Sequence, residues 1–293
     1  MARSLVVGMV LMSGCTPASP ENTNNPATIE QRRAPEEAPD THRLHPEFNL
    51  TPANIQELVG NQPPAIQRRI LSQPAVFLEY VARLLPREAP ILALVDKQTP
   101  LPADYVPDDL VALEQYADQL TLNREGLALR AMIMPDVLAM VEAAKQDGVQ
   151  LDISSTYRSY DYQKSLFEYW TEELGLAEAE RVSARPGTSQ HQLGTTIDFG
   201  SVTPAFAEHP AGVWLLEHAS KFGFSLSYPD GYEAVTGYSY EPWHFRWISR
   251  SGTRMEARYF DGIQHHFLEF WADAESVLRD ACTGGSCRDT VRP

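Results

Sequence analysis

The sequence predicts an α+β fold in which a small, mainly antiparallel sheet is flanked by helices and preceded by an N-terminal helical extension. Segments with helical and strand patterns are mixed along the chain without the regular alternation that marks a parallel sheet. With 293 residues, 43% of them hydrophobic, the chain can bury one sizeable core. We therefore expect one main domain with a smaller helical addition.

The helical extension is predicted over residues 46–90. Thr51 followed by Pro52 is typical of an N-cap and a first helical position, and apolar residues then recur at helical spacing. Further helical runs continue to about Leu85. Later in the chain, stop signals and apolar spacing predict helices over 127–144, 161–174 and 213–222, and a helical segment and tail over 251–293.

Short strands are predicted where β-branched and aromatic residues cluster, at 149–154, 195–199, 224–228 and 243–247. In the second of these, Ile197 and Phe199 share one face, and Thr196 and Asp198 share the other. The apolar pair should pack into the core. Asp198 would then point away from the core, where a carboxylate needs a cation or hydrogen bonds.

The formal net charge of -15 argues against a protein that binds nucleic acid, because neutralising phosphates needs a basic face. We expect a solvated acidic surface instead. Cys282 and Cys287 are separated by a glycine-containing segment that could close into a disulfide in an oxidising compartment.

The N-terminus has the pattern of an export signal over residues 1–15. Arg3 precedes an apolar run that is too short to cross a bilayer, and Ser13-Gly14-Cys15 follows. These residues resemble a bacterial lipoprotein signal, which implies a membrane anchor through lipid on Cys15. An ordinary cleaved signal and a misassigned start are the alternatives. Residues 16–45 are rich in Pro, Asn, Glu and Thr, which predicts a disordered tether.

Four residues form a candidate metal site. His191 lies seven residues before Asp198, and Glu241 lies three before His244. Pro242 favours polyproline geometry, in which Glu241 and His244 point the same way. Two imidazoles and one carboxylate leave a fourth tetrahedral position open, as in catalytic zinc sites. Glu241 would then serve as the general base rather than as a ligand.

The motif Ser189-x-His191-x-x-Gly194-x-x-x-Asp198, followed by Glu241-x-Trp243-His244, resembles the D-alanyl-D-alanine carboxypeptidase family of zinc peptidases. That family includes DD- and LD-carboxypeptidases. Tyr157-Arg158-Ser159 with Gln163 fits the same pattern, and the similarity predicts a catalytic domain over residues 91–250. Thr196 departs from the family, which usually has alanine there, so this side chain is expected to crowd Asp198 or hydrogen-bond to it.

The resemblance implies one zinc ion held by His191, Asp198 and His244, with Glu241 as catalytic base. It also implies that Arg158 recognises the terminal carboxylate of the substrate, assisted by Gln163 and Ser189. Arginine suits this role because its planar guanidinium can form two parallel hydrogen bonds to a carboxylate.

The expected function is therefore a zinc-dependent carboxypeptidase that removes terminal D-alanine from peptidoglycan stem peptides. We expect an exported monomer in the cell envelope that faces the periplasm or cell wall. One alternative is an endopeptidase that cleaves cross-links, and another is a non-catalytic lipoprotein that binds wall peptides. Sequence alone does not separate D,D from L,D specificity.

Overall fold

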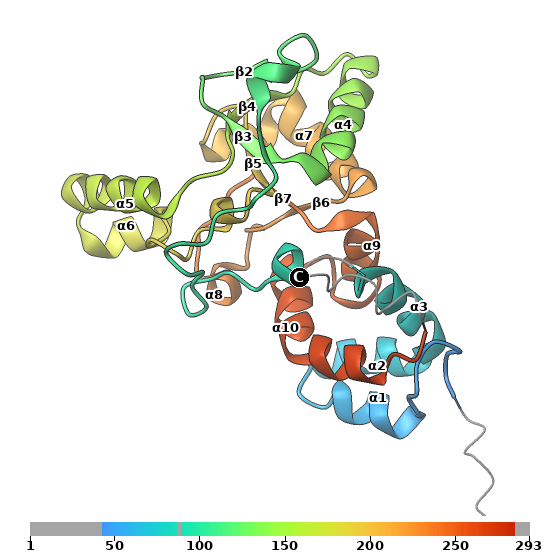
Figure 1. Ribbon diagram of the computed structural model, residues 1–293. Coiled ribbons are helices and arrows are strands. Elements are labelled where there is room, and N and C mark those ends of the chain that lie inside the picture. The colour runs from blue at the N-terminus through green and yellow to red at the C-terminus, as the bar shows by residue number, and fades with distance from the viewer. Residues whose placement is uncertain (1–42, 87–88, 285–293) are drawn as a thin grey trace, which may run out of the picture. The chain divides into compact units, whose positions relative to one another are not determined.

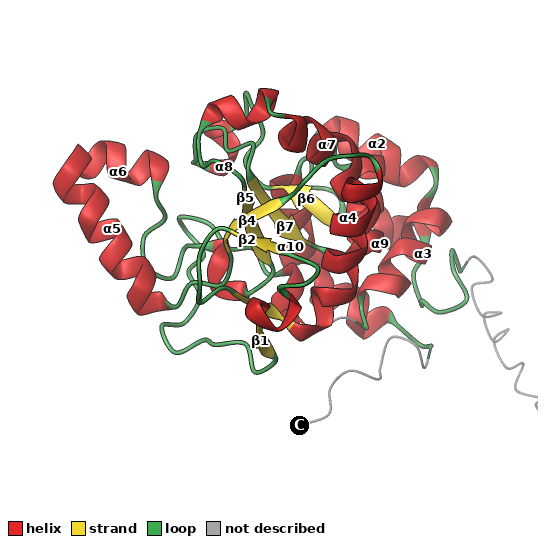
Figure 2. Ribbon diagram, turned by 90° about the horizontal axis from the view of Figure 1, so that it is seen from above, coloured by secondary structure: helices red, strands yellow, loops and turns green. Residues whose placement is uncertain are grey.

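The structure is a computed structural model that describes residues 43–86 and 89–284. The predicted signal, Cys15, Cys287 and nearly all of the predicted tether lie outside these residues. Within the described residues, no helix is both long and apolar enough to cross a membrane. Figures 1 and 2 show the arrangement of the helices and strands.

A five-stranded sheet contains Asp198 and His244, two of the predicted metal ligands, and has the strand order β2-β4-β5-β7-β6. Only the β2 and β4 pair is parallel, and the other three pairs are antiparallel, which confirms the predicted mainly antiparallel sheet. The strands are β2 (Thr121–Leu122), β4 (Asp152–Ser155), β5 (Thr196–Phe199), β6 (Phe224–Leu226) and β7 (His244–Trp247).

The register between β5 and β7 brings two predicted metal ligands together. Asp198 lies directly opposite His244, and Ile197 lies opposite Phe245. Because side chains directly opposite each other share a face of the sheet, this register places Asp198 and His244 side by side. Ile197 and Phe199 are fully buried in the core, as their alternation predicts.

The prediction of one helix over 127–144 is wrong at its start. Residues Ala128–Arg130 form strand β3, which pairs antiparallel with β1 (Leu110–Ala112) and places Leu129 opposite Val111. The helix α4 begins only at Met134, with a proline in its first turn. Leu127 and Leu129 are buried because they alternate along an extended chain, although their spacing also suits the helix that follows.

The described helices include the predicted N-terminal and C-terminal groups. They are α1 (Pro52–Leu58), α2 (Pro64–Ser72), α3 (Pro74–Leu84), α4 (Met134–Gln146), α5 (Tyr160–Leu174), α6 (Leu176–Val182), α7 (Pro210–His218), α8 (Glu233–Thr236), α9 (Ser249–Tyr259) and α10 (Gln264–Ala281). The helix predicted over 213–222 is α7 followed by a 3₁₀ turn, which ends at Gly223 with φ 87°.

Helices from the two ends of the described chain pack together (Figure 1). Both α2 and α3 contact α9, and α9 contacts α10. Phe77 of α3 makes edge contacts with Tyr259 of α9 and with Phe270 of α10, at centroid distances of 5.4 and 5.7 Å. These residues belong to the same hydrophobic core as the sheet residues Ile197 and Phe245. The helices before residue 90 and after residue 250 therefore share one core with the catalytic sheet.

The two ends of the described chain also meet through backbone hydrogen bonds. Phe48 pairs with Cys282 in an antiparallel bridge, and the Thr283 N–H donates to the Glu47 carbonyl at 2.8 Å. Cys282 is buried and disulfide-bonded. Its pairing with Cys287 stays a prediction, because Cys287 lies outside the described residues.

Glu256 of α9 gives a test of this packing through the pH dependence of stability. Burial raises the pKa of Glu256 from its ordinary 4.5 to about 8, against the opposing effect of the Ser225 hydroxyl, which donates to it at 2.7 Å. Between these two pH values the folded chain therefore holds a proton that the unfolded chain lacks. The free energy of unfolding should fall as pH rises through this window.

We expect Glu256→Gln to be more stable than the wild type at pH 8, by on the order of 4 kcal/mol, and within about 1 kcal/mol of it at pH 5. Glutamine keeps an acceptor for Ser225 but carries no charge. Urea unfolding of both proteins at the two pH values measures the difference. Equal stability of the two proteins at pH 8 would contradict the prediction.

Candidate metal site and its cleft

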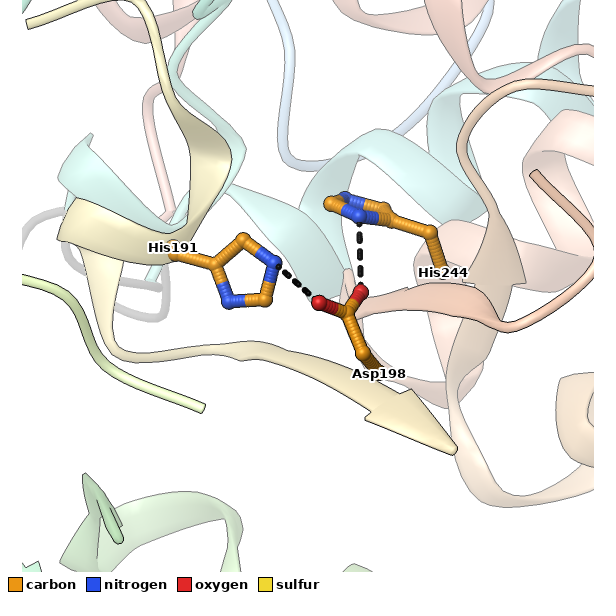
Figure 3. A group of neighbouring side chains, drawn as sticks. All are labelled: His191, Asp198 and His244. Atoms are coloured by element: carbon orange, nitrogen blue, oxygen red, sulfur yellow. Dashed lines mark ion pairs between the residues drawn. The ribbon is translucent and has the colours of Figure 1, made fainter. Parts of the chain in front are cut away.

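His191, Asp198 and His244 meet beside the inner strands β5 and β7 of the sheet, and their ligand atoms all lie within 4.8 Å of one another. His191 Nε2 is 3.1 Å from Asp198 Oδ2, and His244 Nδ1 is 3.0 Å from Asp198 Oδ1 (Figure 3). All three side chains are buried. Three residues from two strands and a turn therefore form one compact group that could hold a metal ion.

The turn that carries His191 is a short 3₁₀ helix, η4 (Gln190–Leu193). The Ser189 hydroxyl caps it by accepting from the His191 N–H at 3.3 Å, and Gly194 ends it in the left-handed region with φ 69°. The His191 ring donates from Nδ1 to the Thr156 carbonyl at 2.6 Å. This hydrogen bond places the proton on Nδ1, so the lone pair of Nε2 faces Asp198.

Two polar atoms in the group have no hydrogen-bond partner although they are buried, His191 Nε2 and Asp198 Oδ1. Leaving buried polar atoms unsatisfied costs free energy, which a bound cation would offset. Two nitrogen donors and one carboxylate are typical ligands of a catalytic zinc ion with an open coordination position. The residues present therefore fit zinc.

The protonation states also suit metal binding. Burial, together with the Arg158 charge, lowers the pKa of His191 to about 4, so this imidazole is neutral near pH 7. Burial opposes ionisation of Asp198, but its interactions with His191 and His244 outweigh that effect and hold its pKa well below the ordinary value. A neutral imidazole and an ionised carboxylate are the forms that ligate metals.

Glu241 lies beside the group without belonging to it. Its Oε2 is 3.3 Å from His244 Nδ1, and its side chain is largely buried. Burial, and then the Asp198 charge, raise the pKa of Glu241 well above its ordinary value, and Arg158 opposes this shift. A carboxyl group with a raised pKa next to a metal site is typical of a general base.

The backbone between Glu241 and His244 differs from the predicted polyproline geometry. The His244 N–H donates to the Glu241 carbonyl at 3.1 Å, which closes a turn around Pro242 and Trp243. Proline at the second position of a turn has its φ angle already set. The turn brings the Glu241 and His244 side chains to the same side. The sequence pattern predicts this placement, but through polyproline geometry.

A cleft of about 750 Å³ opens over these residues. One wall is apolar and comes from the hairpin of α5 and α6. A second wall is aromatic and comes from the segment between β6 and β7. These walls contain Leu166, Trp170, Leu174 and Val182 on the first side, and Tyr228, Tyr238, Tyr240 and Trp243 on the second. No function is predicted for the tyrosines from the sequence, because nothing in their spacing distinguishes a cleft wall from a surface loop.

The three predicted substrate residues all line this cleft. Arg158 places Nη2 3.6 Å from Asp198 Oδ2, and its buried Nε has no hydrogen-bond partner. Gln163 donates from Nε2 to the Ala184 carbonyl at 2.7 Å, while its buried Oε1 has no partner. Arg158 and Gln163 therefore each keep one polar atom that a substrate could satisfy.

The expected hydrogen bond from Thr196 to Asp198 is wrong. Its hydroxyl donates instead to the Gln190 carbonyl at 3.2 Å, which supports the turn that carries His191. Thr156, which lies two residues before Arg158, accepts at its hydroxyl from the Ala128 N–H at 3.0 Å. Its carbonyl is also the partner of His191, so this threonine joins β3 to the metal site.

An α+β fold with two imidazoles, a carboxylate and a separate buried glutamate in one cleft is the arrangement of a metal-dependent hydrolase. Residues 126–250 match the family described as VanY: D-alanyl-D-alanine carboxypeptidase. A bifunctional D-Ala-D-Ala dipeptidase and D-Ala-D-Ala carboxypeptidase, VanXYC of Enterococcus gallinarum, is 33% identical over 174 residues, which cover 54% of this chain and 83% of that protein. The chain belongs to this carboxypeptidase family.

Two solved structures support the assignment. The LdcB LD-carboxypeptidase is 33% identical with a TM-score of 0.55, covering 61% of this chain and 86% of its own. A vancomycin-resistance D,D-pentapeptidase VanY mutant in complex with Zn(II) is 29% identical with a TM-score of 0.51, covering 61% of this chain and 99% of its own. The chain spans only 62% and 58% of the length of two other curated relatives.

Proposed function

We propose that the protein is a zinc-dependent carboxypeptidase that removes terminal D-alanine from peptidoglycan stem peptides. The observation that carries the proposal is the grouping of His191, Asp198 and His244 with Glu241 beside them in one cleft. The relatives support the substrate class, since their names describe D-alanyl-D-alanine carboxypeptidases and an LD-carboxypeptidase. One zinc ion held by the three residues would activate water and polarise the scissile carbonyl.

The chain supplies the proton transfers. Glu241 would take a proton from the attacking water and deliver it to the leaving amine of D-alanine. Its raised pKa lets it hold that proton near neutral pH instead of releasing it at once. Because Glu241 is outside the group of possible ligands, its carboxylate remains free for this exchange.

Arg158 favours a carboxypeptidase over an endopeptidase that cleaves cross-links. It is the positively charged side chain of the cleft that lies nearest the metal group, 3.6 Å from Asp198. A guanidinium at this place can bind the free carboxylate of a terminal residue and so fix which peptide bond reaches the metal. An internal bond of a cross-link offers no such carboxylate.

The direct test is D-alanine release from purified peptides ending in D-Ala-D-Ala, and from tetrapeptides ending in L-Lys-D-Ala or diaminopimelate-D-Ala, with and without zinc. The preferred peptide decides between D,D and L,D specificity. Cleavage of cross-linked dimers without release of terminal D-alanine would favour the endopeptidase. Binding of every peptide without cleavage of any would favour the wall-peptide-binding protein.

Replacing Arg158 with lysine should lower kcat/KM by about 10- to 100-fold on peptides with a free C-terminal carboxylate. Lysine keeps the charge but offers one point donor where the guanidinium offers two parallel ones. The same peptides with an amidated C-terminus should be poor substrates for both proteins. A wild-type enzyme that cleaves amidated and free peptides equally well would contradict the proposed binding of the terminal carboxylate by Arg158.

We also infer an exported protein of the cell envelope that acts as a monomer and is anchored through lipid on Cys15. The basic and apolar start of the chain and its Ser13-Gly14-Cys15 segment support this proposal. Peptidoglycan as substrate supports the same location, since it lies outside the cytoplasmic membrane. The proposed catalytic domain covers residues 91–250.

A further inference from the structure

Behind the metal site lies a buried cluster of amide and hydroxyl groups that reaches His244 from the side opposite Asp198. His244 uses Nδ1 toward Asp198 and Glu241, at 3.0 and 3.3 Å. Its other ring nitrogen, Nε2, lies 3.4 Å from Oε1 of Gln190. A histidine ligand is held in its productive tautomer by the partner of its second nitrogen, so Gln190 decides which nitrogen of His244 is free for metal.

The orientation of the Gln190 amide is itself fixed by two neighbours. Its Oε1 accepts from the Ser227 hydroxyl at 2.7 Å, and its Nε2 donates to Oε1 of Gln264 at 3.2 Å. An amide turned by 180° would point its N–H groups at the Ser227 hydroxyl and at His244 Nε2. With its NH₂ toward Gln264, Gln190 can only present an acceptor to His244, so the His244 proton must be on Nε2.

Gln264 is anchored in turn by the backbone of the sheet. Its Nε2 donates to the Ser225 carbonyl in β6 at 3.2 Å, which leaves its Oε1 as the acceptor for Gln190 and, at 3.3 Å, for the Ser227 hydroxyl. A backbone carbonyl can only accept, so it sets the direction of every hydrogen bond that follows. The side chains of this cluster are at most 5% exposed: His244, Gln190, Ser227 and Gln264.

We propose that Gln264, the first residue of α10, is a positioning residue for the metal site: through Gln190 it holds His244 with its proton on Nε2 and its Nδ1 free for zinc. The proposal deepens the proposed function, because it rests on the same metal site. Gln264 lies outside the residues that match the family, which end at 250. The C-terminal helix therefore contributes to the chemistry as well as to the core.

We call the hydrogen-bonded path from Gln264 through Gln190 to His244 the relay. A double-mutant cycle in the full chain tests it. Gln264→Met keeps the size of the side chain and removes its three hydrogen bonds, so the Gln190 amide loses its fixed direction. Zinc affinity, measured by competition with a chelating dye, should fall about tenfold. Gln190→Glu presents a permanent acceptor to His244, so in that background Gln264→Met should change zinc affinity by less than about threefold.

Thr253→Val is the matched control, since it removes a part-buried hydrogen bond from the Thr253 hydroxyl of α9 to the Ser220 carbonyl at 2.8 Å. It should leave zinc affinity unchanged. An equal loss of affinity in Thr253→Val and Gln264→Met, or an equal effect of Gln264→Met in both Gln190 backgrounds, overturns the relay. A wild type without zinc affinity overturns the proposed function instead.

A second measurement needs no variant and applies even where Gln264→Met does not fold. In the zinc-loaded wild type with ¹⁵N-labelled histidine, the His244 ring should show a one-bond ¹⁵N–¹H coupling at Nε2 and none at Nδ1. A proton found on Nδ1 of His244 would contradict the proposal.

Discussion

Replacing Glu241 with glutamine should lower kcat for D-alanine release by about 10²- to 10⁴-fold, with zinc still bound. Glutamine has nearly the same shape and can lie in the same place beside His244, but it cannot accept the proton of the attacking water. Because Glu241 is not one of the three possible ligands, removing its charge should leave zinc stoichiometry unchanged. The assay is D-alanine release with metal content measured on the same samples.

Glu233→Gln is a matched control for this change. Glu233 lies in α8 and forms an exposed ion pair with Arg181 at 2.9 Å, so it has no part in the proposed proton transfer. This variant should retain wild-type activity. If Glu241→Gln loses zinc in proportion to activity, Glu241 is a ligand and a different base is required.

Removing one imidazole from the metal group should have the second large effect. In His244→Ala the group retains one imidazole and one carboxylate, so zinc should no longer copurify at one equivalent per chain. The expected loss of activity is roughly 10³-fold or more, because the several kcal/mol that a catalytic metal supplies correspond to about three factors of ten. Metal analysis and D-alanine release on the same preparation measure both effects.

His265→Ala separates loss of a ligand from loss of any histidine. The His265 ring is 3.3 Å from a Glu269 oxygen and 4.0 Å from an Asp96 oxygen, so it also lies among carboxylates. It does not belong to the group that could hold a metal. Its replacement should leave both zinc content and activity near wild type. Full zinc occupancy in His244→Ala would show that the metal lies elsewhere.

The fold could be predicted where the pattern is local. The alternation of Ile197 and Phe199 gives strand β5 and its buried face, and Gly223 gives the end of a helix. The strand at Leu129 could not be found this way, because its partner Val111 lies in another segment, outside the local pattern around Leu129. The residues of a strand do not show which other segment will form hydrogen bonds with it.

The candidate site could be predicted further than the fold around it, since its four residues occur in two short motifs. Their grouping in space, however, depends on the register that places Asp198 opposite His244. Gln264 could not be predicted at all. It lies in a helix with an ordinary apolar pattern, and only its burial beside Gln190 distinguishes it from a surface glutamine.

The bridge between Phe48 and Cys282 has a consequence for the order in which the protein folds. Glu47 and Thr283, which are hydrogen-bonded there, are 236 residues apart in the chain. A chain made from its N-terminus must therefore hold α2 and α3 without their partner α9 until α9 has been made. If Gln264 orients His244 as proposed, the three metal-binding residues are made before α10 but reach their full zinc affinity only when α10 has packed against the sheet.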